Sequence, residues 1–130
     1  MIVLDASAAV DWLLQTSAGQ NIEKRIYSRK QTLHVPDLFD LEVVQVLRRL
    51  ASQGVVSVNR ADEAVRDLLD LRVTRYPPLV LVPRIWQLRH NCSAYDAAYI
   101  VLAEKLGAAL VTRDARLASA PGHAAFVELF

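Results

Sequence analysis

The sequence has little cysteine, glycine or proline and no long apolar run. Cys92 is the only cysteine among 130 residues, which excludes an internal disulfide and a cysteine-cluster metal site. Four glycines and five prolines exclude a collagen-like or low-complexity chain. The apolar runs Met1–Leu4 and Leu79–Val82 are far shorter than a signal peptide's apolar region or the roughly 20 residues that cross a bilayer. We therefore expect a globular protein of the reducing cytoplasm with no membrane partner.

An excess of one charge sign is also missing. Fifteen Lys and Arg against fourteen Asp and Glu give a formal net charge of +1, which excludes a purely electrostatic nucleic-acid binder with a uniformly basic surface. Hydrophobic residues make up 53% of the chain, enough for a sizeable core. Without a linker or an internal repeat, residues 1–130 are expected to form a single domain.

Short apolar segments alternate with longer segments of helical periodicity. The apolar segments predict strands at residues 2–4, 33–35, 79–82, 109–112 and 125–127. The periodic segments predict helices at residues 6–14, 18–30, 37–53, 59–72 with Asn59 as its cap, a short stretch after Pro83, 93–105 and 113–118. Strands alternating with helices imply βαβ crossovers, so the expected fold class is α/β, with a parallel sheet covered by helices on both faces.

Two acids lie where a predicted strand passes into a helix. Asp5 follows the first strand and Asp114 follows the strand at residues 109–112. Asp is a common cap at such a position, and this explains either residue alone. In an open α/β sheet, however, the carboxyl ends of parallel strands also form the ligand crevice. Both acids are therefore candidates for one cleft.

Two further acids lie on predicted helices near apolar side chains. Asp96 lies on the apolar stripe of its helix beside Tyr99, where a carboxylate needs a counter-charge. The capping box that starts at Ser93 is the alternative explanation of Asp96. Glu42 lies at the edge of an apolar stripe, and its alternative explanation is an ordinary solvated helix acid or a pair with Arg49.

Four carboxylates in one cleft repel one another and would protonate or move apart without a cation. The three histidines are not spaced as a metal pair, so an all-oxygen set suits the hard ions Mg²⁺ or Mn²⁺. Ser7 and Thr112 would add hydroxyl groups at the same rim, although bonding to the local backbone explains them equally well.

The ordered set of these motifs resembles the PIN-domain family, and within it the bacterial VapC-type toxins. The segments that carry the resemblance are Ile2–Ala8, Leu41–Val43, Ser93–Tyr99, Leu102–Glu104 and Leu110–Asp114, which occur in the family's order and at fitting spacing over essentially the whole chain. The resemblance implies a three-layer α/β/α sandwich with a central parallel sheet. It also implies a Mg²⁺- or Mn²⁺-dependent endoribonuclease, usually homodimeric and held inactive by a cognate antitoxin protein.

The resemblance assigns roles to individual positions. Asp5, Glu42, Asp96 and Asp114 match the acidic quartet that binds the metal and is catalytic in the family, and the supporting hydroxyl positions match Ser7 and Thr112. Gln45 departs from the asparagine that many relatives have one turn after the glutamate, which puts the usual supporting contact of that position in doubt.

RNA and antitoxin would bind beside the acids. Arg113, Arg116 and Arg49 are candidates for phosphate contacts, whereas most of the other arginines are expected on solvated helix faces. The predicted helices at 6–14 and 37–50 carry more apolar residues than one buried stripe needs, so they are candidate walls of an antitoxin groove. Burial on two sides by the fold or by a dimer partner explains the same excess.

Three other functions stay open. A PIN nuclease of RNA processing that is no toxin would share the whole acidic set, and a PIN relative that only binds would keep the fold without catalysis. A phospho-receiver domain has a similar length and an acidic crevice. It fits poorly, because its phospho-accepting Asp should end a strand near the middle of the chain, where residues 37–53 predict a helix.

Overall fold

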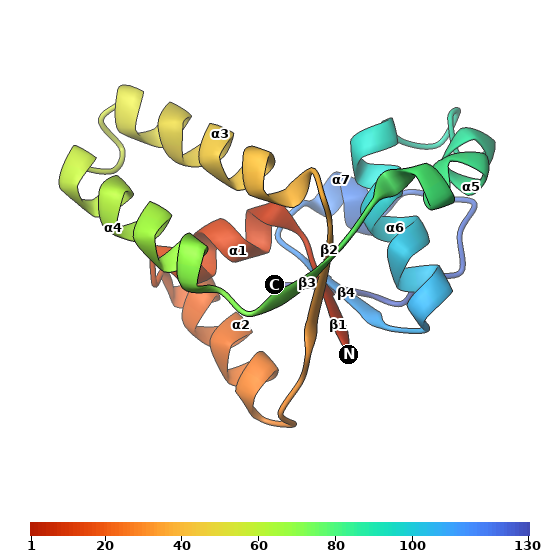
Figure 1. The fold of residues 1–130 in the computed structure, drawn as a ribbon, viewed down its shortest axis with the longest axis horizontal. Coiled ribbons are helices and arrows are strands. Elements are labelled where there is room, and N and C mark those ends of the chain that lie inside the picture. Colours follow the sequence, from red (N-terminus) through yellow and green to blue (C-terminus); the bar gives the residue numbers. More distant parts are fainter.

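Five parallel strands form one sheet in the computed structural model, which describes residues 1–130 (Figure 1). The strands are β1 (Ile2–Leu4), β2 (Leu33–Pro36), β3 (Val73–Tyr76), β4 (Ala109–Thr112) and β5 (Val127–Leu129). Their order in the sheet is β3-β2-β1-β4-β5, and each neighbouring pair is parallel. The predicted parallel α/β architecture is confirmed.

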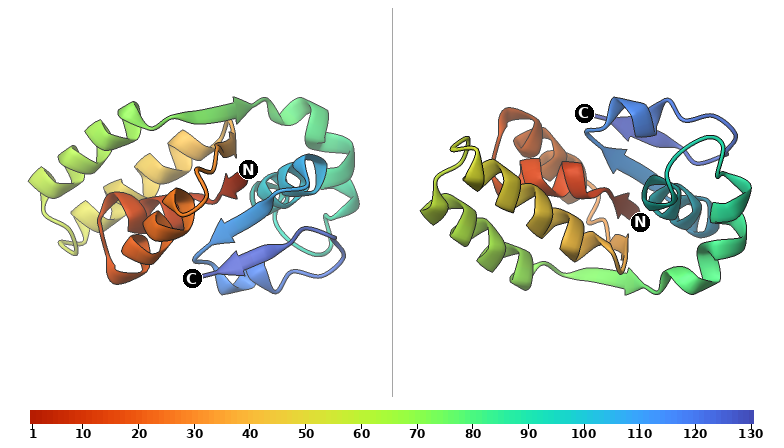
Figure 2. Two further views of the ribbon diagram at one scale, coloured as in Figure 1. Left: turned by 90° about the horizontal axis from the view of Figure 1, so that it is seen from below. Right: turned by 90° about the horizontal axis from the view of Figure 1, so that it is seen from above.

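Helices cover both faces of this sheet (Figures 1 and 2). One layer holds α1 (Ala6–Leu13), α2 (Ser17–Tyr27), α3 (Phe39–Ser52) and α4 (Val58–Asp70). The other holds the 3₁₀ helix η1 (Pro78–Leu81), α5 (Val82–Gln87), α6 (Ala94–Leu106) and α7 (Ala115–Ala118). The result is the expected three-layer α/β/α sandwich.

The central strands and α6 form the middle of the core. All of β1 is fully buried, and α6 is buried from Ala97 to Ala103, so the helix has no polar face over that stretch. A strand covered on both sides has to be apolar at every position, which is why Ile2, Val3 and Leu4 show no polar alternation. No helix is long and apolar enough to cross a membrane.

The position predicted for the third strand is wrong. Residues 79–82 form η1 and the start of α5, because Pro78 opens a helical turn and lacks the N–H that a strand would donate. The strand is Val73–Tyr76, an edge strand with no buried residue, which pairs only with β2. An edge strand needs no continuous apolar run, so it escaped the search for buried strands.

Smaller boundaries also differ from the prediction, and two of them show the reason. The last strand is Val127–Leu129 and not 125–127. The cap of α4 is Ser57, whose hydroxyl accepts a hydrogen bond from the Arg60 N–H, and Asn59 lies inside the helix. Both segments are exposed or half-buried, where few contacts constrain the pattern.

The sheet has a switch point between β1 and β4. The chain leaves β1 toward β2 with its helices on one face, and leaves β4 toward β5 with α7 on the other. Crossovers that diverge in this way leave a crevice at the carboxyl ends of the two strands. Asp5 directly follows β1, and Asp114 follows β4 after the single loop residue Arg113.

Candidate active site

A pocket of about 340 Å³ lies at the switch point and collects all four predicted acids. Its lining comes from both helical layers and comprises Asp5, Ala6, Ser7, Val10, Asp11, Glu42, Val46, Arg49, Leu50, Asp96, Arg113 and Asp114. Acids from the first and last quarters of the chain meet here because β1 and β4 are neighbours in the sheet.

Asp5 is held by two hydroxyl groups and does not cap its helix. The Oδ2 atom of Asp5 accepts hydrogen bonds from Ser7 Oγ and, at 2.8 Å, from Thr112 Oγ1. These hydroxyls in turn accept from the main-chain N–H groups of Arg113 and Asp114, both at 3.0 Å. The network ties the end of β1 to the loop after β4 and orients the carboxylate. Asp5 is nearly buried, and this burial raises its pKa, although the two hydroxyl bonds act in the opposite direction.

Asp114 both lines the pocket and caps α7. Its Oδ1 atom accepts from the N–H groups of Arg116 at 2.8 Å and Leu117 at 3.4 Å. The capping explanation considered from the sequence therefore applies to Asp114 but not to Asp5. A carboxylate has several lone pairs, so Asp114 Oδ2 is left over for a ligand.

Glu42 reaches across the end of the sheet from α3 to α6. Tyr99 donates a hydrogen bond to Glu42 Oε1 at 3.0 Å, and Glu42 makes no ion pair with Arg49. Burial raises the pKa of Glu42 to about 7, with the Tyr99 bond lowering it and the negative charges of Asp5 and Asp96 raising it further. The environment thus disfavours a negative charge that has no counter-cation.

Asp96 lies in the first turn of α6. Ser93 Oγ accepts from the Asp96 main-chain N–H at 3.1 Å, so the predicted N-cap is present and the Asp96 side chain lines the pocket. Burial, followed by the charges of Asp114 and Asp5, raises the pKa of Asp96. The charges of Asp5 and Asp96 act on Glu42, and those of Asp114 and Asp5 act on Asp96, so the four acids form one electrostatic cluster.

The carboxylates share a pocket but do not converge on one point. No three His, Cys, Asp or Glu side chains approach closely enough to hold one ion in the conformations described. Mutual repulsion favours this separation, and side-chain rotation would be needed to bring the acids around an ion. The all-oxygen donor set and its unfavourable negative charge fit a hard divalent cation.

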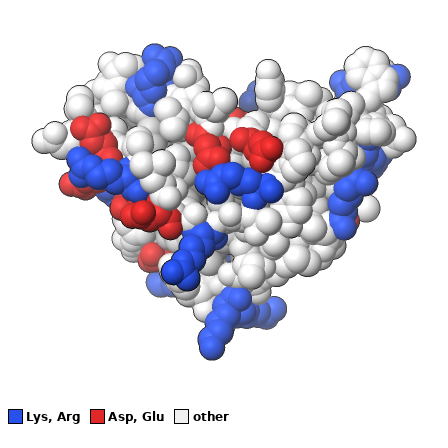
Figure 3. Space-filling view, viewed as in Figure 1, with Lys and Arg blue, Asp and Glu red and all other residues white.

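The three candidate phosphate-binding arginines differ in their placement. Arg49 and Arg113 line the pocket, and Arg49 has no ion-pair partner. Arg116 lies outside the lining, is 90% exposed, and approaches Asp114 Oδ1 only to 3.8 Å. Gln45, the departure from the family pattern, accepts from Arg48 Nε at 3.0 Å and does not line the pocket. Figure 3 shows acidic and basic side chains interspersed over one face, in place of one basic surface.

Sequence reasoning missed two residues of the site. Asp11 lines the pocket and accepts from Arg113 Nε at 2.7 Å, and Tyr99 holds Glu42. Their spacing carried a usable signal, because Asp11 lies four residues after Ser7 and Tyr99 three after Asp96, each one helical turn away. The partner of each residue lies on another element, so spacing alone could not name it.

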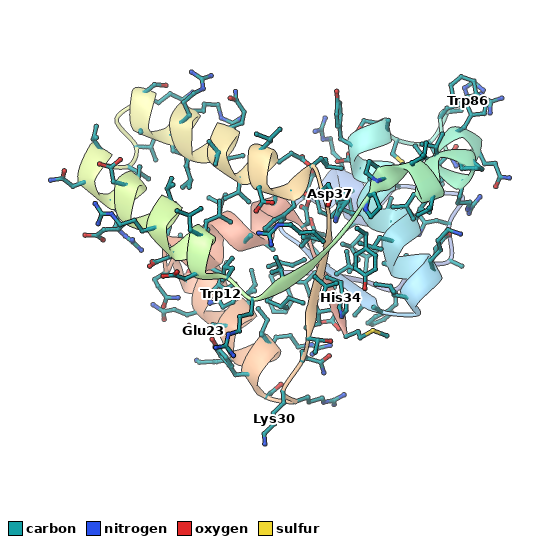
Figure 4. The ribbon with its side chains drawn as sticks, in the orientation of Figure 1. Trp12, Glu23, Lys30, His34, Asp37 and Trp86 are labelled. Atoms are coloured by element: carbon teal, nitrogen blue, oxygen red, sulfur yellow. The ribbon has the colours of Figure 1, made fainter.

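The two tryptophans lie outside the pocket lining. Trp12 is buried and donates to Glu23 Oε1 at 3.2 Å (Figure 4). Trp86 is 66% exposed at the outer end of the molecule, with the Arg89 guanidinium 4.8 Å from its ring centroid.

Comparison with known proteins assigns the fold to a family. The family model described as PIN domain matches residues 2–122, so the chain belongs to the PIN-domain family. Ribonuclease VapC12 of Mycobacterium tuberculosis is 42% identical over 129 residues, which cover 99% of this chain and 98% of that protein.

Solved structures agree with this assignment. PAE2754 from Pyrobaculum aerophilum has a TM-score of 0.68 and 29% identity, and the match covers 97% of this chain and 82% of that one. VapBC2 from Rickettsia felis, bound to a DNA fragment from its promoter, has a TM-score of 0.69 over 100% and 99% of the two chains. At 13% identity this second match shows the fold alone. The expected resemblance to VapC-type PIN proteins is confirmed.

Proposed function

We propose that this chain is a divalent-metal-dependent endoribonuclease that acts as the toxin of a VapBC-type toxin-antitoxin pair. The observation that carries the proposal is the single pocket at the switch point of the sheet, lined by Asp5, Glu42, Asp96 and Asp114. The 42% identity to a protein named as a VapC ribonuclease, over nearly the full length of both chains, supports the same activity. Residues 1–130 act as one nuclease domain in this proposal.

The four acids would hold Mg²⁺ or Mn²⁺. When bound, such an ion activates a water molecule and stabilises negative charge on a phosphodiester. Asp5 is pre-oriented by Ser7 and Thr112, whose hydroxyls donate to its Oδ2 atom, and Tyr99 holds Oε1 of Glu42. These bonds limit the rotation of two of the four acids, which reduces the entropy cost of gathering them around an ion.

The RNA backbone would approach over the pocket rim. Arg49 on α3 and Arg113 after β4 place guanidinium groups from two different elements along the lining. Arginine donates paired N–H groups to phosphate oxygens, which would seat the backbone across the acids. Arg116, although outside the lining, is exposed beside Asp114 and remains a proposed contact for an adjacent phosphate.

The antitoxin would bind in an apolar groove that continues from the acidic pocket. This groove of about 520 Å³ shares Val10, Asp11 and Leu50 with the pocket and adds Leu14, Val55 and Val56. Its walls belong to α1, to the end of α3 and to the loop before α4, which extends the predicted walls toward α4. An amphipathic antitoxin helix with apolar anchors fits such a groove.

A homodimer is the remaining part of the proposal. Leu79, Val80, Val82 and Trp86 are between 48% and 78% exposed on η1 and α5. An apolar segment of this kind favours burial against a second copy. Sedimentation of the wild type should give a dimer, and Val80→Asp should give a monomer. A monomeric wild type would contradict this part.

Cleavage of labelled single-stranded RNA tests the activity. The wild type should cut in millimolar Mn²⁺ and stop in excess EDTA, and Asp96→Asn should lower the rate by about 100-fold or more because it removes a ligand charge. Asp62→Asn is the matched control, since Asp62 is exposed on α4 away from the pocket. Undiminished cleavage by Asp96→Asn would contradict the metal site. RNA binding without cleavage by the wild type would favour the PIN relative that only binds.

Expression in bacteria tests the toxin role. The chain alone should arrest growth, Asp96→Asn should not, and a co-expressed cognate antitoxin should restore growth. Cleavage of RNA in vitro without growth arrest would favour a PIN nuclease of RNA processing.

A further inference from the structure

We propose that Asp11 is a positioning residue that holds the guanidinium of Arg113 at the rim of the acidic pocket. This inference deepens the proposed ribonuclease function and rests on it. The sequence pointed to Arg113 as a phosphate contact but gave no reason for its orientation. Its ion pair with Asp11 supplies that reason, because both side chains line the pocket.

Asp11 is itself held rigidly. Its Oδ1 atom accepts from Thr16 Oγ1 at 2.9 Å, and its Oδ2 atom accepts from Arg113 Nε at 2.7 Å. Its backbone packs so closely against α2 that a Cβ atom on Gly19 would lie 1.9 Å from the Asp11 carbonyl oxygen. A carboxylate held at both oxygens and at its backbone is a suitable anchor for a long, flexible arginine.

Arg113 is held at several points and still has a free donor. Its main-chain N–H donates to Ser7 Oγ, Nε donates to Asp11, and Nη1 donates to the main-chain oxygen of Phe130. Nη2 makes no hydrogen bond within the chain, and the side chain is 40% exposed. The free donor is thus held at the pocket rim, where an RNA phosphate would arrive.

The pairing has a definite kinetic consequence. The Asp11 charge offsets that of Arg113, so the pair adds little long-range attraction for RNA, and its effect should lie in placing the phosphate. Asp11 acting only as an anionic neighbour would weaken RNA binding without affecting the cleavage step. Asp11 acting as a metal ligand would control the Mn²⁺ requirement. Each role gives a different result on substitution.

Asp11→Asn is the central variant, because asparagine can keep the Thr16 bond while losing the ion pair. At saturating RNA, we expect the single-turnover cleavage rate to fall about 10-fold, because the guanidinium loses its orientation. The dissociation constant for labelled RNA in EDTA, measured by fluorescence anisotropy, should not increase, because the variant loses a negative charge that repels RNA. The Mn²⁺ concentration for half-maximal rate should stay at the wild-type value.

A double-mutant cycle tests whether Asp11 acts through Arg113. Arg113→Ala should slow cleavage to a similar extent, and adding Asp11→Asn to it should have no further effect. Arg49→Ala is the matched control, since Arg49 lines the same pocket without pairing to Asp11, so its effect should multiply with that of Asp11→Asn. Melting curves identify any variant that has lost its fold, and Asp11→Ala provides a second substitution.

Three results would overturn the proposal. They are an unchanged cleavage rate in Asp11→Asn, a further loss when Asp11→Asn is added to Arg113→Ala, and a raised Mn²⁺ requirement. Cleavage by the wild type separates the two proposals. An inactive wild type would overturn the ribonuclease function together with this inference, whereas an active wild type with an unaffected Asp11→Asn would overturn this inference alone.

Discussion

The two strand–helix junctions at the switch point look alike in sequence and differ in structure. Asp5 follows β1 and precedes α1, and Asp114 occupies the same position between β4 and α7. Asp114 accepts from two N–H groups of its own helix. Asp5 accepts no such bond and is held by the hydroxyls of Ser7 and Thr112.

Burial explains the difference between these junctions. Asp5 directly follows the central strand β1, and its side chain is nearly buried. Asp114 caps the four-residue helix α7 at the surface, and its side chain is 29% exposed. A buried carboxylate needs directed donors, whereas a surface carboxylate can serve as a cap and still face a ligand. The acid's position along the chain is therefore insufficient to define its role.

Stabilisation by bound metal should be the largest effect. Its loss in variants of Asp5 and Asp114 tests whether both junctions hold the ion. Mn²⁺ at a hundredfold excess over its Kd should stabilise the wild type by about 2.7 kcal/mol. Asp5→Asn and Asp114→Asn should each lose most of this gain, because each removes a ligand charge. Thermal denaturation with and without Mn²⁺ measures it. If Mn²⁺ stabilised Asp114→Asn as much as the wild type, Asp114 would be a helix cap and not a metal ligand.

The carboxyl group of Glu42 in the pocket should also make the free energy of unfolding depend on pH. The pKa of Glu42 is about 7 in the folded protein and about 4.5 in the unfolded chain, so the folded state binds the proton more tightly. The stabilising contribution of protonated Glu42 to the free energy of unfolding is therefore fully present below about pH 4.5 and is lost as the pH rises through about 7. In EDTA, Glu42→Gln should have a flatter stability profile than the wild type and should be the more stable protein at about pH 8.

The quantity to measure is the difference in the free energy of unfolding between the wild type and Glu42→Gln at each pH. His34 is buried, which lowers its pKa and makes stability rise with pH, and this contribution cancels in the difference. Equal profiles for the wild type and Glu42→Gln would contradict the buried, charge-coupled state of Glu42.

The smallest expected effect contrasts the two junctions directly. Without metal, Asp114→Ala should lower the free energy of unfolding by about 1 kcal/mol, because α7 loses its cap. Asp5→Asn should raise the melting temperature, because it removes a buried charge that repels Glu42 and Asp96. Calorimetry in EDTA gives both values, and changes of the same sign would mean that the two junctions are equivalent.

The sequence predicted the acids of the pocket well because each has a local signal. Asp5 and Asp114 follow apolar runs, and Asp96 directly precedes the buried stretch Ala97–Ala103 of its helix. The structure brings these three residues and Glu42 into one lining, as expected, and their roles as metal ligands stay a prediction. The pairings of Asp11 with Arg113 and of Tyr99 with Glu42 join residues 102 and 57 positions apart. No local pattern contains such a pairing.

Hydrophobic patterning by itself determined the parallel α/β class, the central strands β1 and β4, and the buried helix α6, because elements covered on both sides must be apolar throughout. Tertiary structure alone decided that the third strand is Val73–Tyr76, since an edge strand is defined by its neighbour β2 and not by its own composition. It also decided which acid caps a helix and which is held by hydroxyls, because burial and the partner groups arise only when distant segments pack together.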